Sequence, residues 1–129
     1  MRLAAEHCDV VSLNVYKHSP EIPYPASARD RPVIVGEFHF GALDRGMFHT
    51  GLVPTANQAE RAVAYGKYVR DCLADDRIVG AHWFQYRDQA FTGRNDGECF
   101  QIGFLNAADA PYPEMVEMSR TLARELYAR

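Results

Sequence analysis

Glu37 is the residue whose position is most unusual for its chemistry. It directly follows Val33-Ile34-Val35-Gly36, an apolar stretch in which an unpaired carboxylate is costly. A carboxylate held rigidly at a strand end suits cleavage of a glycosidic bond, because the nucleophile must face the anomeric carbon with little freedom. We therefore predict that Glu37 is a catalytic nucleophile. The alternative is a buried structural ion pair with Arg45 or Arg87.

Two aromatic residues end other apolar stretches and are expected near Glu37. Tyr16 closes the stretch that begins at Val11, and its phenol could orient the carboxylate and keep it ionised through a hydrogen bond. Trp83, the only tryptophan, could offer the flat apolar surface on which a sugar ring stacks. The alternative for both side chains is that they fill the protein core.

Other polar residues lie beside these strand ends or in the loop that follows the last strand. His39 and Gln85 lie next to predicted strand ends, whereas Asn95, Asp96 and Glu98 belong to the loop. We expect all five to contact the substrate. For the three loop residues the alternative is a solvated turn.

A metal site is the weaker interpretation of the same region. Carboxylate and imidazole groups together suit zinc, and Glu37 could combine with His39, His49 and His82. However, the sequence has no HExxH or HxH pattern, and it also lacks the serine-hydrolase, P-loop and dinucleotide motifs. We therefore expect neither a metal nor another cofactor.

Composition narrows the possible partners. The chain has 129 residues, of which 47% are hydrophobic, and this is enough apolar material for one packed domain. Its formal net charge is −3, so no basic field would attract nucleic acid. We expect no membrane span and no export signal, because charged residues interrupt every apolar stretch. The location of the complete protein, secreted or periplasmic for example, stays open.

Strands and helices are expected to alternate. The patterns predict strands over 8–16, 31–38 and 78–86, a short strand over 99–105, a short helix over 24–30, and helices over 55–74 and 113–129. Thr55 and Gln58 fit a capping box at the start of the longer helix. This order favours an α/β fold with parallel strands, in which ligands bind at the carboxyl ends of the strands.

Three of these stretches together resemble a known group of enzymes. The segments 11–16, 31–38 and 80–86 resemble, in order, the sixth, seventh and eighth strands of the clan A glycoside hydrolases. The resemblance implies that residues 1–129 are the C-terminal portion of a (β/α)8 TIM barrel, within a retaining catalytic domain. It also implies that Glu37 is the nucleophile, Tyr16 its hydrogen-bonding partner and Trp83 the aromatic platform.

The loops resemble one family more narrowly. Gly36-Glu37-Phe38-His39-Phe40-Gly41, Thr92-Gly93-Arg94-Asn95-Asp96-Gly97-Glu98 and Gln101-Ile102-Gly103-Phe104 are similar to the β-agarase family, glycoside hydrolase family 50. This resemblance covers nearly the whole chain. It implies a β-agarase or a β-galactosidase-like enzyme, whose substrate is an oligosaccharide or polysaccharide that contains galactose.

The acid/base glutamate of the clan has no counterpart in this sequence. That residue usually stands in an Asn-Glu pair at the end of a strand, and none of the other glutamates ends a suitable strand. We therefore expect a fragment of a longer enzyme that is inactive when isolated. The alternative is a self-standing, noncatalytic α/β domain that binds carbohydrate or forms oligomers.

Overall fold

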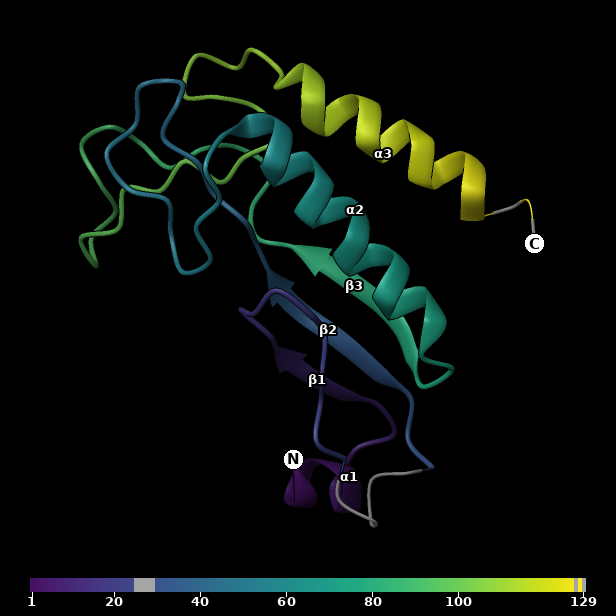
Figure 1. Cartoon of the computed structure of the whole chain (residues 1–129). Coiled ribbons are helices and arrows are strands. Elements are labelled where there is room, and N and C mark those ends of the chain that lie inside the picture. The colour runs from purple at the N-terminus through teal and green to yellow at the C-terminus, as the bar shows by residue number, and fades with distance from the viewer. Residues whose placement is uncertain (25–29, 127, 129) are drawn as a thin grey trace.

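The computed structural model describes residues 1–24, 30–126 and 128. Figure 1 shows the elements in chain order: α1 (Arg2–His7), β1 (Val11–Asn14), β2 (Val33–Phe38), α2 (Gln58–Ala74), β3 (Ile78–Trp83) and α3 (Pro113–Leu126). The three main strands and two main helices that the sequence predicts are present. Residues 25–29 of the predicted helix over 24–30 lie outside the described residues.

The strands form one parallel sheet in the order β1-β2-β3. Val11 is paired with Val33 in the first ladder, and Phe38 is paired with Trp83 in the second. β2 is the central strand and is rich in β-branched residues, as expected for a strand with neighbours on both sides. Because the strands are parallel, their carboxyl ends and the loops that follow them lie at the same end of the sheet (Figure 1).

The expectation that residues 1–129 form the C-terminal portion of a (β/α)8 TIM barrel is wrong. The described residues form a small α/β fold, in which three helices accompany a sheet of three strands. A TIM barrel closes only when eight tilted strands pair in a ring. In the part of the chain that the structure describes, the sheet instead ends at β1 on one side and at β3 on the other.

Two helices, α2 and α3, cover one face of this sheet in two layers. Figure 1 shows α2 lying along the sheet, with α3 packed on the outer side of α2. Phe38 of β2 is stacked on Tyr68 of α2 with the ring centroids 4.3 Å apart, and buried Val35 and Cys72 extend the same core. Core residues therefore anchor β2 on both sides of Glu37, at Val35 and at Phe38.

Two predicted elements differ from expectation, one in where it begins and the other in whether it forms. α2 begins at Gln58, and its N-cap is Asn57, whose side chain accepts a hydrogen bond from the backbone N–H of Glu60 at 2.9 Å. The expected capping box is absent because the Thr55 hydroxyl instead donates to the carbonyl of Gly41 at 3.0 Å. The segment 99–105 is extended but forms only isolated bridges, so it is not a strand.

None of the helices within the described ranges is long and apolar enough to span a membrane.

Candidate active site

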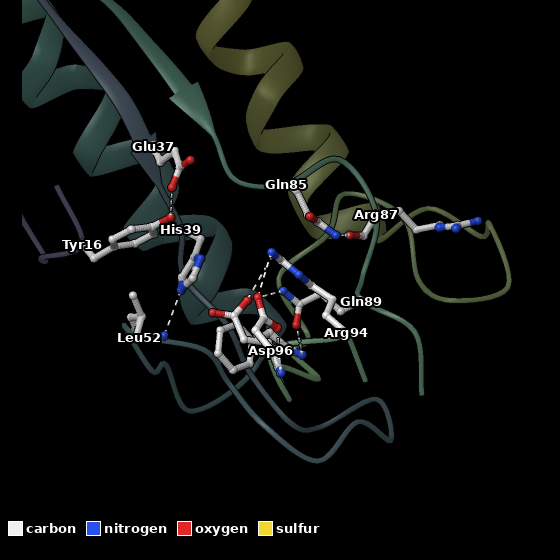
Figure 2. A network of polar contacts seen from close by, with 11 residues as sticks. Tyr16, Glu37, His39, Leu52, Gln85, Arg87, Gln89, Arg94 and Asp96 are labelled. Carbon is white, nitrogen blue, oxygen red and sulfur yellow. Dashed lines mark hydrogen bonds and ion pairs between the residues drawn. The ribbon is translucent and has the colours of Figure 1, made fainter. Parts of the chain in front are cut away.

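Tyr16 and Glu37 meet at the carboxyl end of the sheet. The Tyr16 hydroxyl donates a hydrogen bond to Oε2 of Glu37 at 2.5 Å, as Figure 2 shows. The adjoining backbone holds the two residues together, because the N–H of Val15 donates to the carbonyl of Glu37 at 2.9 Å. The expected contact between the phenol and the carboxylate is therefore present.

Gly36 allows β1 to approach this part of β2 closely. A Cβ atom at position 36 would lie 2.5 Å from Oγ of Ser12 and 3.0 Å from Oδ1 of Asn14. A larger residue would therefore push against the side chains of β1. The glycine directly before Glu37 thus helps to bring the two strand ends together.

Tyr16 remains a hydrogen-bond donor at neutral pH. Burial raises the pKa of Tyr16 well above its usual value, and both the hydrogen bond to Glu37 and the charge of Glu37 act in the same direction. The phenol of Tyr16 therefore keeps the proton that it donates in the hydrogen bond to Glu37.

The alternative role for Glu37, an ion pair with Arg45 or Arg87, is not what the structure shows. Arg45 is paired with Glu114 and lies 3.9 Å from Asp44. Arg87 is paired with Asp109 at 3.2 Å. Both arginines bind other carboxylates, so the partner of Glu37 is the phenol of Tyr16.

His39 lies directly beside this pair but is almost inaccessible. Its relative exposure is 1%, and its ring centroid is 4.7 Å from that of Tyr16. Nε2 of His39 accepts a hydrogen bond from the backbone N–H of Leu52 at 2.8 Å. Burial lowers the pKa of His39 to about 4, so the ring is neutral at neutral pH. Its expected contact with substrate stays a prediction.

Trp83 is packed into the layer between the sheet and the helices. Its ring meets those of Phe38, Tyr65 and Phe104 edge to face, with centroids between 5.2 and 5.6 Å apart. Its indole N–H donates to the carbonyl of Ile102 at 2.8 Å. These contacts give Trp83 a packing role, and its stacking on a sugar stays a prediction.

Phe84 is the aromatic residue on the side of His39, and the sequence analysis overlooked it. Its ring centroid is 6.3 Å from that of His39, and the guanidinium of Arg94 lies 5.7 Å from the Phe84 centroid. Successive side chains along a strand point to opposite faces, so a sequence that places Trp83 on the core face predicts that the next residue, Phe84, faces the other side. That alternation is the signal that could have singled out Phe84.

Two of the expected loop residues belong to a polar network around Arg94 (Figure 2). Arg94 is paired with Asp96 at 2.9 Å and with Glu98 at 3.3 Å, and Glu98 also accepts a hydrogen bond from Gln89 at 2.8 Å. Glu98 raises the pKa of Tyr16 and Arg94 lowers it, so this network lies within electrostatic reach of the Tyr16–Glu37 pair.

The two remaining expected residues, Asn95 and Gln85, have fewer contacts with the rest of the candidate site. Asn95 is exposed at the turn of the same loop. The side-chain amide of Gln85 donates to the carbonyl of Arg87 at 3.0 Å, which turns part of this side chain toward its own loop. Contacts between these residues and a substrate stay predictions.

A buried arginine on α2 holds together the two loops that carry the site. Arg61 has a relative exposure of 0%, and it donates hydrogen bonds to the carbonyls of Phe40 and Gly103, one in each loop. Burial lowers the pKa of Arg61 to about 10, while Asp88 and Tyr112 act in the opposite direction, so it is charged at neutral pH. An arginine on a helix usually lies on the solvated face. For this reason the sequence did not indicate that Arg61 is buried and joins the two loops.

The histidines near Glu37 do not form a metal site. Within residues 1–24, 30–126 and 128, no group of three or more His, Cys, Asp or Glu side chains could hold a metal ion. Nδ1 of His49 accepts a hydrogen bond from the backbone N–H of Gly51 at 3.1 Å, and His82 is exposed on β3.

Comparison with known proteins connects the chain with β-agarases, although no family model matches it. β-Agarase B and β-agarase A of Vibrio sp. (strain JT0107) are each 41% identical to it, over 128 and 132 residues respectively. Each alignment covers 96% of this chain but 13% of the relative. The chain thus spans only a small part of the length of these relatives.

A solved structure of an exo-β-agarase shows the same relationship. It matches with a TM-score of 0.90 and 43% sequence identity, over 98% of this chain and 17% of that chain. Both sequence and fold are therefore shared along nearly the whole of this chain. The chain is homologous to one region of β-agarases.

Proposed function

We propose that residues 1–129 are part of the catalytic domain of a retaining β-glycoside hydrolase, with Glu37 as its nucleophile. The hydrogen bond from Tyr16 to Glu37 at the strand ends carries this proposal. It holds Oε2 of the carboxylate in place and leaves Oε1 to attack. Homology to a region of β-agarases supports a substrate of the agar type, a polysaccharide that contains galactose.

The proposed reaction has two steps. In the first, Oε1 of Glu37 attacks the anomeric carbon, the glycosidic C–O bond breaks, and the leaving oxygen takes a proton from a second carboxyl group. In the second, water attacks the ester on Glu37, gives a proton to that second group, and releases the free carboxylate. Tyr16 keeps its proton and orients Glu37 throughout. The reaction requires no cofactor.

We propose that the second carboxyl group comes from a part of the protein outside residues 1–129. In retaining enzymes the two carboxyl groups stand roughly 5 Å apart. Glu98 reaches the site only through electrostatics, and its carboxylate is already occupied by Gln89 and Arg94. The isolated chain is then expected to be inactive.

A segment exchange tests this proposal. Residues 1–129 would replace the aligned segment of β-agarase B from Vibrio sp. (strain JT0107), and release of oligosaccharides from agarose would be measured. Glu37→Gln should reduce the activity of the chimera at least about a thousandfold, since nucleophile and general acid/base effects are of that order. Glu117→Gln on the exposed side of α3 is the matched control and should leave the activity unchanged.

A fluorinated galactoside with a good leaving group would identify the nucleophile directly. The fluorine slows hydrolysis of the ester intermediate, so the labelled residue can be found by mass spectrometry of the chimera. Label on Glu37 supports the proposal. Label on another residue, or an active Glu37→Gln chimera, would refute it.

Exposed aromatic rings favour a second candidate function, a noncatalytic domain that binds carbohydrate. Phe48, Tyr86 and Phe91 are 74%, 70% and 60% exposed, and all three lie on the loops that follow β2 and β3. Such rings could stack on sugars without any chemistry at Glu37. This candidate predicts that Glu37→Gln leaves agarose binding and hydrolysis by the chimera unchanged.

A further inference from the structure

His39 connects the Tyr16–Glu37 pair to the loop that follows β2. It comes two residues after Glu37, its ring lies against Tyr16 at 4.7 Å, and its Nε2 accepts the backbone N–H of Leu52 at 2.8 Å. Figure 2 shows the imidazole between the phenol of Tyr16 and the chain at Leu52. One buried side chain thus contacts both the candidate catalytic pair and a distant part of the loop.

The hydrogen bond to Leu52 determines the tautomer of His39. Since Nε2 accepts an N–H, it carries no proton, and a neutral ring must then be protonated on Nδ1. Nδ1 is buried and completes no hydrogen bond within the described ranges. The nearby backbone of Phe84 raises the pKa of His39, but the cost of burial is larger and lowers it overall.

The surroundings leave the imidazole little room to turn. A Cβ atom at Gly51 would lie 2.6 Å from Nε2 of His39, so only glycine allows the loop to pass this close. The backbone of Gly51 has a φ of +77°, a conformation that also favours glycine. The rings of Phe84 and Phe100 approach His39 with centroids 6.3 and 6.0 Å away.

We propose that His39 is a positioning residue, which fixes the ring of Tyr16, and through it the carboxylate of Glu37, relative to the loop that carries Leu52. The proposal rests on the proposed role of Glu37 as the nucleophile. His39 is only 1% exposed, so the contribution proposed here is made through its contact with Tyr16.

The first test is a measurement on the unaltered 129-residue chain. Nitrogen NMR of His39 should show a proton on Nδ1, none on Nε2, and no protonation of the ring from pH 7 down to pH 5.5. A proton on Nε2, or a charged imidazole at pH 6, would overturn the proposal, because the bond from Leu52 could not then exist.

The second test compares two substitutions in the same chain. His39→Leu removes the acceptor, so exchange of the Leu52 amide proton should become about tenfold faster, and the NMR signal of the Tyr16 ζ-carbon should shift. His39→Gln keeps an acceptor near the same place and should restore both readouts in part. His82→Gln on the exposed surface of β3 is the control and should change neither.

The Tyr16 signal separates positioning from a role in stability alone. If His39 merely fills the core, His39→Leu lowers stability while the Tyr16 signal remains as it was, and the proposal fails. If the His39→Leu variant does not fold, the position of the proton on the His39 ring of the unaltered chain still tests the proposal. Failure of the proposed function is distinguishable, since it would appear as an active Glu37→Gln chimera with the Tyr16 shift intact.

Discussion

Nε of Arg61 lies 2.9 Å from the carbonyl oxygen of Phe40 and donates a hydrogen bond to it. Phe40 comes three residues after Glu37, so this hydrogen bond fixes the start of the loop that follows β2. The same guanidinium lies 5.5 Å from the ring centroid of Trp83 at the end of β3. One side chain from α2 therefore stabilises the ends of two neighbouring strands.

Replacement of Arg61 should strongly destabilise the chain. Arg61→Met removes the donors to the carbonyls of Phe40 and Gly103, and it also removes the positive charge that interacts with buried Asp88. We expect a loss of roughly 3–5 kcal/mol in the free energy of unfolding, measured with denaturant. Arg70→Met breaks an exposed pair with Glu125 and should cost less than about 1 kcal/mol. Equal losses in the two variants would contradict this role.

Stability should fall in mild acid because of His39. The pKa of His39 is about 4 in the folded chain and about 6.5 when unfolded, so the unfolded state binds the extra proton first. The contribution of His39 to the free energy of unfolding is fully present above pH 6.5 and is lost as the pH falls toward 4. Between pH 7 and pH 5 we expect a loss of roughly 2 kcal/mol in the free energy of unfolding.

A variant isolates that contribution from those of other groups. His39→Gln cannot titrate, so its stability should change less between pH 7 and pH 5 than that of the unaltered chain. Tyr16, Glu37 and Arg61 surround the imidazole electrostatically, and none of these positions differs between the two proteins. Parallel pH profiles would show that His39 is not the responsible group.

Loss of the Tyr16 hydroxyl should lower kcat for agarose while it changes KM little. In the β-agarase chimera, Tyr16→Phe removes a hydrogen bond to a charged carboxylate, which is worth roughly 1.5–3 kcal/mol. We expect kcat for agarose to fall about 10- to 100-fold while KM changes little. Tyr86→Phe, at an exposed tyrosine, is the comparison, and a decrease of the same size there would argue against a special role for Tyr16.

Two glycines distinguish backbone strain from a steric contact with His39. Gly51 and Gly46 both have positive φ angles, +77° and +96°, but only a Cβ at Gly51 would meet neighbouring atoms within 4 Å. Gly46→Ala should therefore cost about 1–2 kcal/mol for the backbone alone. Gly51→Ala should cost more, and it should shift the imidazole signals of His39 in NMR spectra, which Gly46→Ala should leave in place.

The local chemistry of the sequence was easier to predict than the larger architecture. Glu37 and Tyr16 both end β-branched stretches, and parallel strands bring such ends together, so their contact could be anticipated. The α/β class with parallel strands could also be anticipated, but the barrel expectation was wrong, because strand motifs of a few residues resemble those of a closed barrel even where the described residues form a sheet of three strands. The resemblance was local, whereas barrel closure depends on strand number and tilt.

The surroundings of single side chains could not be predicted from the sequence. The indole N–H of Trp83 donates to the carbonyl of Ile102, and Phe84 lies beside His39, whereas the stacking of Trp83 on a sugar stays a prediction. Arg61 escaped notice because a buried arginine cannot be told from a solvated one by its spacing on a helix. The N-cap at Asn57 was missed because Thr55 had a competing partner in Gly41.

The attachment of both long loops to Arg61 affects how this region can diverge. Phe40 and Gly103 are fixed to one guanidinium, whereas the exposed Phe48 and Phe91 lie elsewhere on the same two loops. Replacing the tips should therefore leave the framework at the strand ends intact. For the proposed glycoside hydrolase, this predicts that exchange of the loop tips could change the sugar preference while Glu37 is retained.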